Sequence, residues 1–255
     1  PFLRKLFNCP IANISHAKTG KTNWYNYIDF DYYFVYGSLC KKSLNDHKSQ
    51  INGTKVIPIG PFFSTIKVKL DKQKSTKIDI TRKDKITICI SSQWWSAKKS
   101  DYLVYHYEKL SSLINERQDI FFYIKPHPLE KTRDSPLHEV ADLENVNYLS
   151  KEVGIVSVSE LTDCHMTCFS NTAIDFALLD IPTILLRYND NSLLDRSDMI
   201  PDDYKLILDD NYELDRLLSL EKNINTILKY NCDGIGLESI DRFRSKIDEI
   251  VREAD

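Results

Sequence analysis

The sequence lacks both a long apolar run and a strong excess of one charge. Nowhere do roughly 18 consecutive apolar residues occur, which excludes an ordinary transmembrane helix. The first residues show no signal-peptide pattern of charged start, apolar run and small-residue cleavage site. The formal net charge is -3 over 255 residues, so no overall basic field favours nucleic acid. We therefore expect a cytoplasmic protein that does not bind nucleic acid.

Two common ligand-binding signatures are also missing. Lys18-Thr-Gly-Lys-Thr22 matches the end of a phosphate-binding P-loop, but Ser15 stands where that loop requires a glycine. Cys164 and Cys168 flank His165 on a predicted strand, where residues four apart lie about 13 Å from one another, too far for one ion. We expect no metal and no cofactor. The six cysteines lie mostly in apolar runs, as buried thiols of a reducing compartment do: Cys9, Cys40, Cys89, Cys164, Cys168 and Cys232.

What the sequence does contain is a regular alternation of strand-like and helix-like segments after Lys85. This order predicts a mostly parallel sheet with helices on both faces. The expected strands cover residues 86–90, 120–124, 165–169 and 183–186, with a short one near Val146. The expected helices cover residues 102–117, 158–161, 171–179, 212–228 and 237–252.

The residues before this alternation predict part of a second unit. Strand-like runs occur at 11–14, 32–36 and 55–59, and a helix is expected at 38–48. Residues 64–85 are rich in Lys, Asp, Thr and Ser and hold no Gly or Pro, which indicates an exposed connector. Weak alternations at 66–70 and 78–80 alternatively favour edge strands. We thus expect an α/β protein of two Rossmann-like halves, with residues 1–63 and 86–255 joined by a connector at 64–85.

Two segments end apolar runs with side chains that bind anions, Tyr123-Ile-Lys-Pro-His-Pro128 and Cys168-Phe-Ser-Asn-Thr-Ala-Ile-Asp175. In the first, Lys125 and His127 follow a strand, and the carboxyl ends of strands are where open α/β sheets bind ligands. In the second, Ser170, Asn171 and Thr172 lead into a helix, whose start binds phosphate without a metal. Alternatively, Ser170 or Asn171 only caps the helix, and His127 is a turn histidine bonded to a carbonyl.

Three further residues are candidates on weaker patterns. His16 follows a predicted strand and is of the right type for a general base. Trp94 is expected to stack on a base or sugar, or else to pack between domains together with Trp95. Gln93, which follows the strand expected at residues 86–90, is a further candidate for binding the nucleotide donor.

The segments Ile86 to Gln93, Lys125-Pro-His-Pro128 and Thr162 to Ile184 together resemble the C-terminal half of GT-B transferases that build bacterial surface polymers. The pattern is similar to CDP-glycerol glycerophosphotransferases and bacterial polysialyltransferases, which pair a His-Pro motif with a Ser-Ser or Ser-Thr motif. The resemblance implies that His127, Ser170 and Thr172 hold the phosphate of a cytidine nucleotide, although Asn171 stands where a second serine is expected. Ile14-Ser-His-Ala17 looks like the His-Gly motif of glycerophosphotransferases, which would make His16 the base.

This resemblance implies a metal-independent, inverting glycosyltransferase. Residues 1–63 would form a partial acceptor-side half, which is either minimal or incomplete, and residues 86–255 would bind the nucleotide donor. The expected reaction transfers a sugar from a cytidine-nucleotide donor, such as a CMP-linked acidic sugar, to a capsule or lipopolysaccharide glycan. The alternatives are a CDP-polyol phosphotransferase of teichoic-acid-like polymers, a non-catalytic nucleotide- or glycan-binding domain and a sugar-nucleotide epimerase. Expected partners are a CMP- or CDP-linked donor and a glycan or lipid-linked glycan acceptor, at the inner face of the cell membrane.

Overall fold

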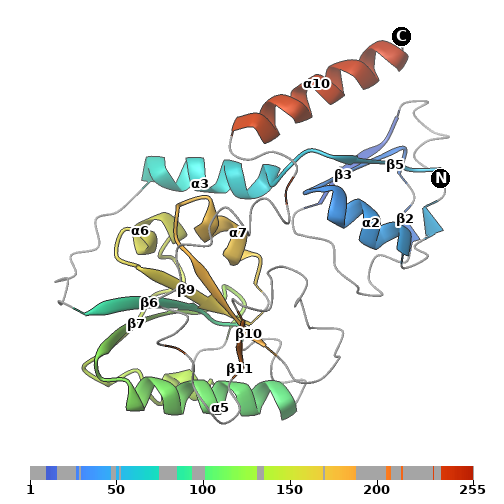
Figure 1. Cartoon of the computed structure of the whole chain (residues 1–255). Coiled ribbons are helices and arrows are strands. Elements are labelled where there is room, and N and C mark those ends of the chain that lie inside the picture. Colours follow the sequence, from blue (N-terminus) through green and yellow to red (C-terminus); the bar gives the residue numbers. More distant parts are fainter. Residues whose placement is uncertain are drawn as a thin grey trace. The chain divides into compact units, whose positions relative to one another are not determined.

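The computed structural model of the chain shows an α/β protein made of two compact units (Figure 1). The first unit comprises residues 1–67 and 225–255, and the second comprises residues 68–224. The structure describes residues 10–15, 27–28, 30–46, 50–51, 53–74, 85–93, 101–130, 135–168, 170–187, 205–207, 214, 232 and 237–254. In this part of the chain, no helix combines the length and the apolarity that crossing a bilayer requires.

The second unit is built on a fully parallel sheet, which has six strands in the described residues and the order β11-β10-β9-β6-β7-β8. Numbered from its first strand, this is the doubly wound order 3-2-1-4-5-6, in which the chain turns back between the first and fourth strands. The strands are β6 (Ile86–Ser91), β7 (Ile120–Lys125), β8 (Val146–Tyr148), β9 (Cys164–Thr167), β10 (Thr183–Arg187) and β11 (Lys205–Ile207).

Helices cover both faces of this sheet, α5 (Asp101–Glu116) on one and α6 (Ile155–Ser159) with α7 (Thr172–Ala177) on the other (Figure 1). Successive residues of a strand point to opposite faces, so Ile88 and Ile90 pack with the α5 side, whereas Cys89 packs with the α6 and α7 side. Because both faces are buried, β7 is apolar over residues 120–124, and the polar residues of β6 and β9, such as Thr87 and His165, are buried as well. The expected α/β class with parallel sheets is therefore confirmed.

The buried stripe of α5 explains why this segment forms a helix. Tyr107, Leu110, Leu113 and Ile114 are all buried and recur at the spacing of one helix face. A short 3-10 helix, η3 (Pro136–His138), lies next to α5, and the Ser111 hydroxyl donates a hydrogen bond to the Pro136 carbonyl at 3.2 Å. Apolar burial and local polar contacts thus fix α5 against the sheet.

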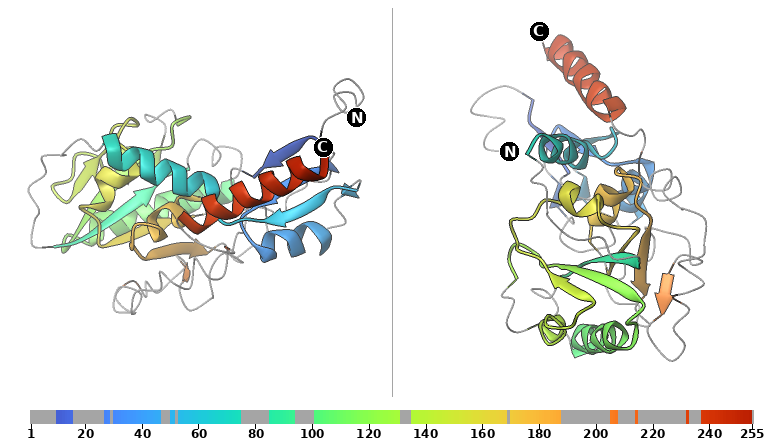
Figure 2. Two further views of the ribbon diagram at one scale, coloured as in Figure 1. Left: turned by 90° about the horizontal axis from the view of Figure 1, so that it is seen from above. Right: turned by 90° about the vertical axis from the view of Figure 1, so that its left-hand side faces the viewer.

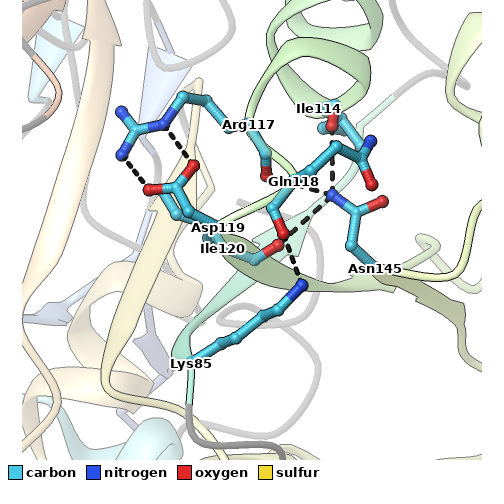
Figure 3. A network of polar contacts seen from close by, with 7 residues as sticks. All are labelled: Lys85, Ile114, Arg117, Gln118, Asp119, Ile120 and Asn145. Atoms are coloured by element: carbon cyan, nitrogen blue, oxygen red, sulfur yellow. Dashed lines mark hydrogen bonds and ion pairs between the residues drawn. The ribbon is translucent and has the colours of Figure 1, made fainter.

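The amino ends of the strands are held by a polar network (Figure 3). The Asn145 amide nitrogen donates to the carbonyl oxygens of Ile114, Arg117 and Ile120 at 3.1–3.2 Å, which ties the end of α5 to the start of β7. The Lys85 ammonium donates to the carbonyl of Gln118 in the same turn.

A second set of hydrogen bonds joins β6 to the residue before β9 at the same amino edge. The backbone N–H and the hydroxyl of Thr87 both donate to Asp163 Oδ2, at 2.9 and 2.8 Å. Hydrogen bonds that satisfy a partly buried carboxylate in this way favour one register of the two strands. Hydrogen bonds within the protein therefore hold the amino edge of the sheet together.

The first unit has a smaller parallel sheet of order β1-β3-β5 in the described residues, with β2 and β4 paired separately. These strands are β1 (Ala12–Ile14), β2 (Tyr27–Ile28), β3 (Tyr32–Val35), β4 (Gln50–Ile51) and β5 (Lys55–Pro58), and the helices are α2 (Ser38–Asp46) and α10 (Leu237–Ala254). The helix α3 (Phe62–Lys74) begins in the first unit and ends in the second. Figure 2 shows α10 beside the strands of this unit.

The C-terminal helix belongs to the first unit, which differs from the expected boundary of 86–255. The Phe243 ring meets the ring of Phe34 at 5.2 Å and that of Phe62 at 4.5 Å between centroids. Ile247 and Ile250 join the same apolar cluster. The unit boundary follows this packing, because α10 buries its apolar stripe against residues far away in the sequence.

The segment expected as a connector begins with a helix instead. Pro61, Ser64, Thr65 and Val68 are buried at helical spacing, so α3 has one face packed although the alternation at 66–70 favours a strand. The alternative of an edge strand at 66–70 is therefore wrong. Residues 78–80, and all of the expected helix at 212–228 except residue 214, lie outside the described residues.

Candidate functional site

The carboxyl ends of β6, β7 and β9 lie side by side at the point where the strand order reverses. Ser91 pairs in register with Lys125. The Thr167 hydroxyl donates to the Ser91 carbonyl at 3.0 Å, and the Ser92 N–H donates to the Lys125 carbonyl at 2.9 Å. Adjacent strands are about 4.8 Å apart, so these three strand ends span about 10 Å, the scale of a nucleotide phosphate and its sugar. Open α/β sheets bind ligands at this position.

The turn after β7 holds His127 in one orientation. The Leu129 N–H donates to His127 Nδ1 at 3.1 Å, and the Glu130 N–H donates to the His127 carbonyl at 2.8 Å. Partial burial, and then the positive charges of Lys125 and Lys151, lower the pKa of His127 below its usual 6.5. The neutral ring that results carries its proton on Nε2, because Nδ1 is an acceptor. The imidazole is thus a donor at Nε2 rather than a ring that bonds a carbonyl through Nδ1.

Glu130, which no sequence pattern singles out, holds this turn in place through hydrogen bonds to its side chain. Its carboxylate is fully buried and accepts the Ser92 hydroxyl at 2.8 Å, the His127 N–H at 3.3 Å and the Tyr148 hydroxyl at 3.3 Å. Burial, and then the nearby Glu130 carboxylate, raise the pKa of Tyr148, so this phenol remains a donor. Glu130 therefore links the ends of β6, β7 and β8.

The segment Ser170-Asn-Thr172 follows β9 and leads into α7. Ser170 is 9 % exposed, and its Oγ accepts the Thr172 N–H at 3.2 Å. Asn171 is the residue before the helix and makes no capping bond with its side chain. Since α7 has six residues, its dipole is small. The hydroxyls of Ser170 and Thr172 are therefore better placed to bind an anion than the helix end is. Ser170 therefore bonds backbone as a capping residue does, and within the described residues no contact uses its hydroxyl proton.

His165, in the middle of β9, lies directly behind the strand ends. It is fully buried, with Nδ1 at 2.9 Å from Thr183 Oγ1 and Nε2 at 2.9 Å from Ser91 Oγ. Its ring stacks on Phe176 at 4.1 Å between centroids and 12° between planes. Burial lowers the pKa of His165 to about 3, so the ring is neutral near pH 7. In the sequence His165 stands out only as a member of the rejected Cys-His-Cys cluster.

The remaining candidates are placed differently. Gln93 is buried two residues after the end of β6, and its backbone N–H donates to the Tyr107 hydroxyl at 2.6 Å. His16 and Trp94, with Trp95, lie outside the described residues. The structure therefore gathers Lys125, His127, Ser170, Asn171, Thr172 and Gln93 around three neighbouring strand ends.

The described cysteines are free and buried, as expected, at positions 40, 89, 164, 168 and 232. Burial raises the pKa of Cys89 and of Cys164 to about 12, so these thiols are poor nucleophiles and poor metal ligands. Within the described ranges, no group of three or more His, Cys, Asp or Glu residues has the arrangement of a metal site.

No protein-family model and no curated protein sequence matches this chain. Solved structures do match. The S. aureus MnaA–UDP co-structure aligns with a TM-score of 0.62 at 12% identity and covers 97% of this chain and 70% of that chain. A putative UDP-N-acetylglucosamine 2-epimerase from Listeria monocytogenes aligns with a TM-score of 0.60 at 12% identity, covering 98% and 70%.

The wall teichoic acid polymerase TagF, in a variant soaked with CDPG, aligns with a TM-score of 0.55 at 14% identity. That alignment covers 89% of this chain but only 59% of the polymerase chain, so this sequence spans little more than half of that neighbour. At such identities the likeness concerns the fold alone. The chain thus has the α/β fold with parallel-stranded, Rossmann-like units that is typical of GT-B proteins.

Proposed function

We propose that the chain is a GT-B enzyme of surface-polymer synthesis that binds a nucleotide-activated donor at the carboxyl edge of its second unit. The observation that carries this proposal is the placement of His127 after β7, and of Ser170 and Thr172 after β9, at the carboxyl ends of the two strands that flank β6 at the switch point of a doubly wound sheet. Each of these groups can donate a hydrogen bond to phosphate, and Lys125 adds a positive charge at the same edge.

The chemistry follows from these donors. A donor phosphate bound here would gain negative charge as its bond to the transferred group breaks, and preorganised donors stabilise such a leaving group. His127 would donate through Nε2, and protonation of its ring would strengthen the contact. His16 would take the proton of the acceptor hydroxyl in a single displacement, with inversion and without a metal.

The donor is proposed to be a cytidine nucleotide, either a CMP-linked acidic sugar or a CDP-linked polyol phosphate. The Lys125-Pro-His-Pro128 and Ser170-Asn-Thr172 motifs support this class by resemblance. The polymerase soaked with CDPG shares the fold and so is compatible with the second donor. The acceptor would be a glycan or lipid-linked glycan of capsule, lipopolysaccharide or a teichoic-acid-like polymer, reached in the cytoplasm at the inner face of the membrane.

The direct test is calorimetric titration of the full chain with CMP, CDP, UDP and GDP. We expect CMP or CDP to bind more tightly than UDP or GDP, and His127→Ala to weaken that binding by about 1.5–3 kcal/mol, the loss of a hydrogen bond to a charged partner. Glu116→Ala is the control, because Glu116 is an exposed residue at the end of α5, next to the amino edge of the sheet. Absence of nucleotide binding by the wild type would contradict the proposal.

A second experiment separates transfer from the other activities. The protein is incubated with a CMP- or CDP-linked donor, with and without a glycan acceptor, and free nucleotide and elongated product are measured. Nucleotide release that depends on the acceptor supports transfer. Conversion of a UDP-linked sugar without acceptor would identify an epimerase, the activity named for one neighbour of this fold. Binding without turnover of any donor would identify a non-catalytic domain.

A further inference from the structure

The His165 side chain connects three elements of the second unit just behind the carboxyl edge. It is contacted by Thr183 on β10 through Nδ1 at 2.9 Å and by Ser91 on β6 through Nε2 at 2.9 Å. Thr172, the first residue of α7, has its hydroxyl oxygen 3.4 Å from the same Nε2. One neutral ring therefore has to satisfy hydroxyls on both of its sides.

The Thr183 hydroxyl decides which ring nitrogen carries the proton. Thr183 is 1 % exposed, and within the described residues His165 Nδ1 is the contact of its hydroxyl. If Nδ1 carried the proton, the hydroxyl would accept it and its own buried proton would have no acceptor there, which is costly. Donation from Thr183 to Nδ1 avoids that cost at the first residue of β10, away from the carboxyl edge. Among the groups that the structure describes, the hydroxyl proton without an acceptor is then that of Ser91, at the carboxyl end of β6, where a ligand oxygen can accept it. The proton of His165 is then on Nε2.

The direction of the remaining bonds follows. A protonated Nε2 donates to Ser91 Oγ, and the Ser91 hydroxyl keeps its own proton for another acceptor. In the part of the chain that the structure describes, no side chain or backbone group accepts that proton, although Ser91 is only 5 % exposed. Ser91 is also the last residue of β6, the central strand of the switch point.

We propose that Thr183, His165 and Ser91 form a hydrogen-bond chain of fixed direction that presents the Ser91 hydroxyl proton to a phosphate oxygen of the bound nucleotide. Ser91 is then a binding residue, and His165 is a positioning residue that acts through it. This inference rests on the proposed nucleotide site. Neutrality of His165 near pH 7, which its burial enforces, supports the single ring proton that the chain requires.

The protonation site is tested without any ligand. Nitrogen-15 NMR of the full chain labelled at histidine distinguishes a ring nitrogen that bears a proton from one that does not. The protein has six histidines, so the His165 signals are assigned by their loss in His165→Gln. We expect the Nε2–H form between pH 6 and pH 8. A ring protonated at Nδ1 would overturn the proposed direction of the chain.

The effect on nucleotide binding is tested with two substitutions of His165 that differ in the length of the side chain. The amide nitrogen of Gln lies near the position of histidine Nε2, whereas the shorter Asn reaches only the position of Nδ1. We expect His165→Gln to bind CMP or CDP within about threefold of the wild type. His165→Asn and Ser91→Ala should each bind about tenfold more weakly, the loss of one hydrogen bond to a charged group.

A double-mutant cycle supplies the internal control. Ser91→Ala combined with His165→Asn should bind no more weakly than either single variant, because both remove the same contact. Circular dichroism and urea unfolding confirm that each variant is folded. Unchanged affinity in folded Ser91→Ala or His165→Asn would overturn the inference. If the wild type binds no nucleotide, the proposed function fails, whereas NMR still decides the direction of the hydrogen-bond chain.

Discussion

At the residue scale, the environment of a side chain sets its charge more than its type does. His127 and His165 are of the same type, yet one is half-buried beside two lysines and the other is fully enclosed between strands. Sequence patterns identify His127 because it follows an apolar run and lies between prolines. They do not identify His165, Ser91 or Glu130 as members of the site, because the partners of these residues are far away in the sequence.

The burial of His165 predicts that the folded protein loses stability as the pH falls. Its pKa is about 3 in the folded state and about 6.5 when unfolded, so the unfolded chain binds more protons between these values. Stability should therefore fall as pH falls below about 6.5, by up to about 1.4 kcal/mol per pH unit from this group. Urea unfolding at pH 7, 6 and 5 measures this. His165→Gln, which does not titrate, should show a shallower fall, and equal slopes for both proteins would contradict the assignment.

Glu130 predicts a stability effect at the strand ends. Glu130→Ala removes the buried carboxylate that accepts from the Ser92 hydroxyl, the His127 N–H and the Tyr148 hydroxyl, so we expect a loss of about 2–4 kcal/mol in the free energy of unfolding. Nucleotide affinity should also fall, because the His127 turn loses its brace. Glu139→Ala is the control, since Glu139 is exposed on the surface, and its effect should stay within about 0.5 kcal/mol. Urea unfolding and calorimetry measure the two effects, and stability equal to that of the wild type would rule out the brace.

At the element scale, periodicity predicts strands and helices but not which strands pair. The strands β6 and β9 are neighbours only because the chain crosses back after β8, and this crossing creates the switch point. The sequence order of α/β elements indicates a parallel sheet without fixing that strand order. In α3 the local pattern itself is misleading, because residues 66–70 alternate as a strand does. Burial of Ser64, Thr65 and Val68 on one side of a helix overrides that pattern.

The packing of α10 predicts that the first unit loses stability when one aromatic side chain of this helix is removed. Phe243→Ala removes a half-buried ring that contacts Phe34 and Phe62, which should cost about 2–4 kcal/mol. Amide hydrogen exchange should accelerate in β3 and β5, and exchange in β6 and β7 should stay unchanged. Arg244→Ala is the control on the same helix, because its ion pair with Asp241 is highly exposed and contributes little. Equal exchange in both variants would show that α10 does not stabilise this unit.

At the scale of the whole molecule, the two edges of the second unit's sheet have different tasks in the proposed function. The second unit has an amino edge occupied by Asn145 and Asp163 and a carboxyl edge that gathers donors. This division follows from the polarity of a parallel sheet, whose strand ends differ in what they present. The sequence pattern predicts two Rossmann-like units and groups residues 237–252 with the second, whereas α10 packs in the first. The contacts of α10 with residues near position 34 carry no local pattern, so the sequence does not reveal them.

The division of tasks predicts that a nucleotide stabilises one unit selectively. At a ligand concentration of 100 times Kd, binding adds about 2.7 kcal/mol to the stability of the state that binds. With CMP or CDP, amide exchange should therefore slow at the carboxyl ends of β6, β7 and β9, and exchange in β3 and β5 should change little. The Ser91→Ala variant under the same nucleotide concentration should show weaker protection at these ends. Protection confined to the first unit would move the nucleotide site away from the switch point, because a ligand stabilises the structure that it contacts.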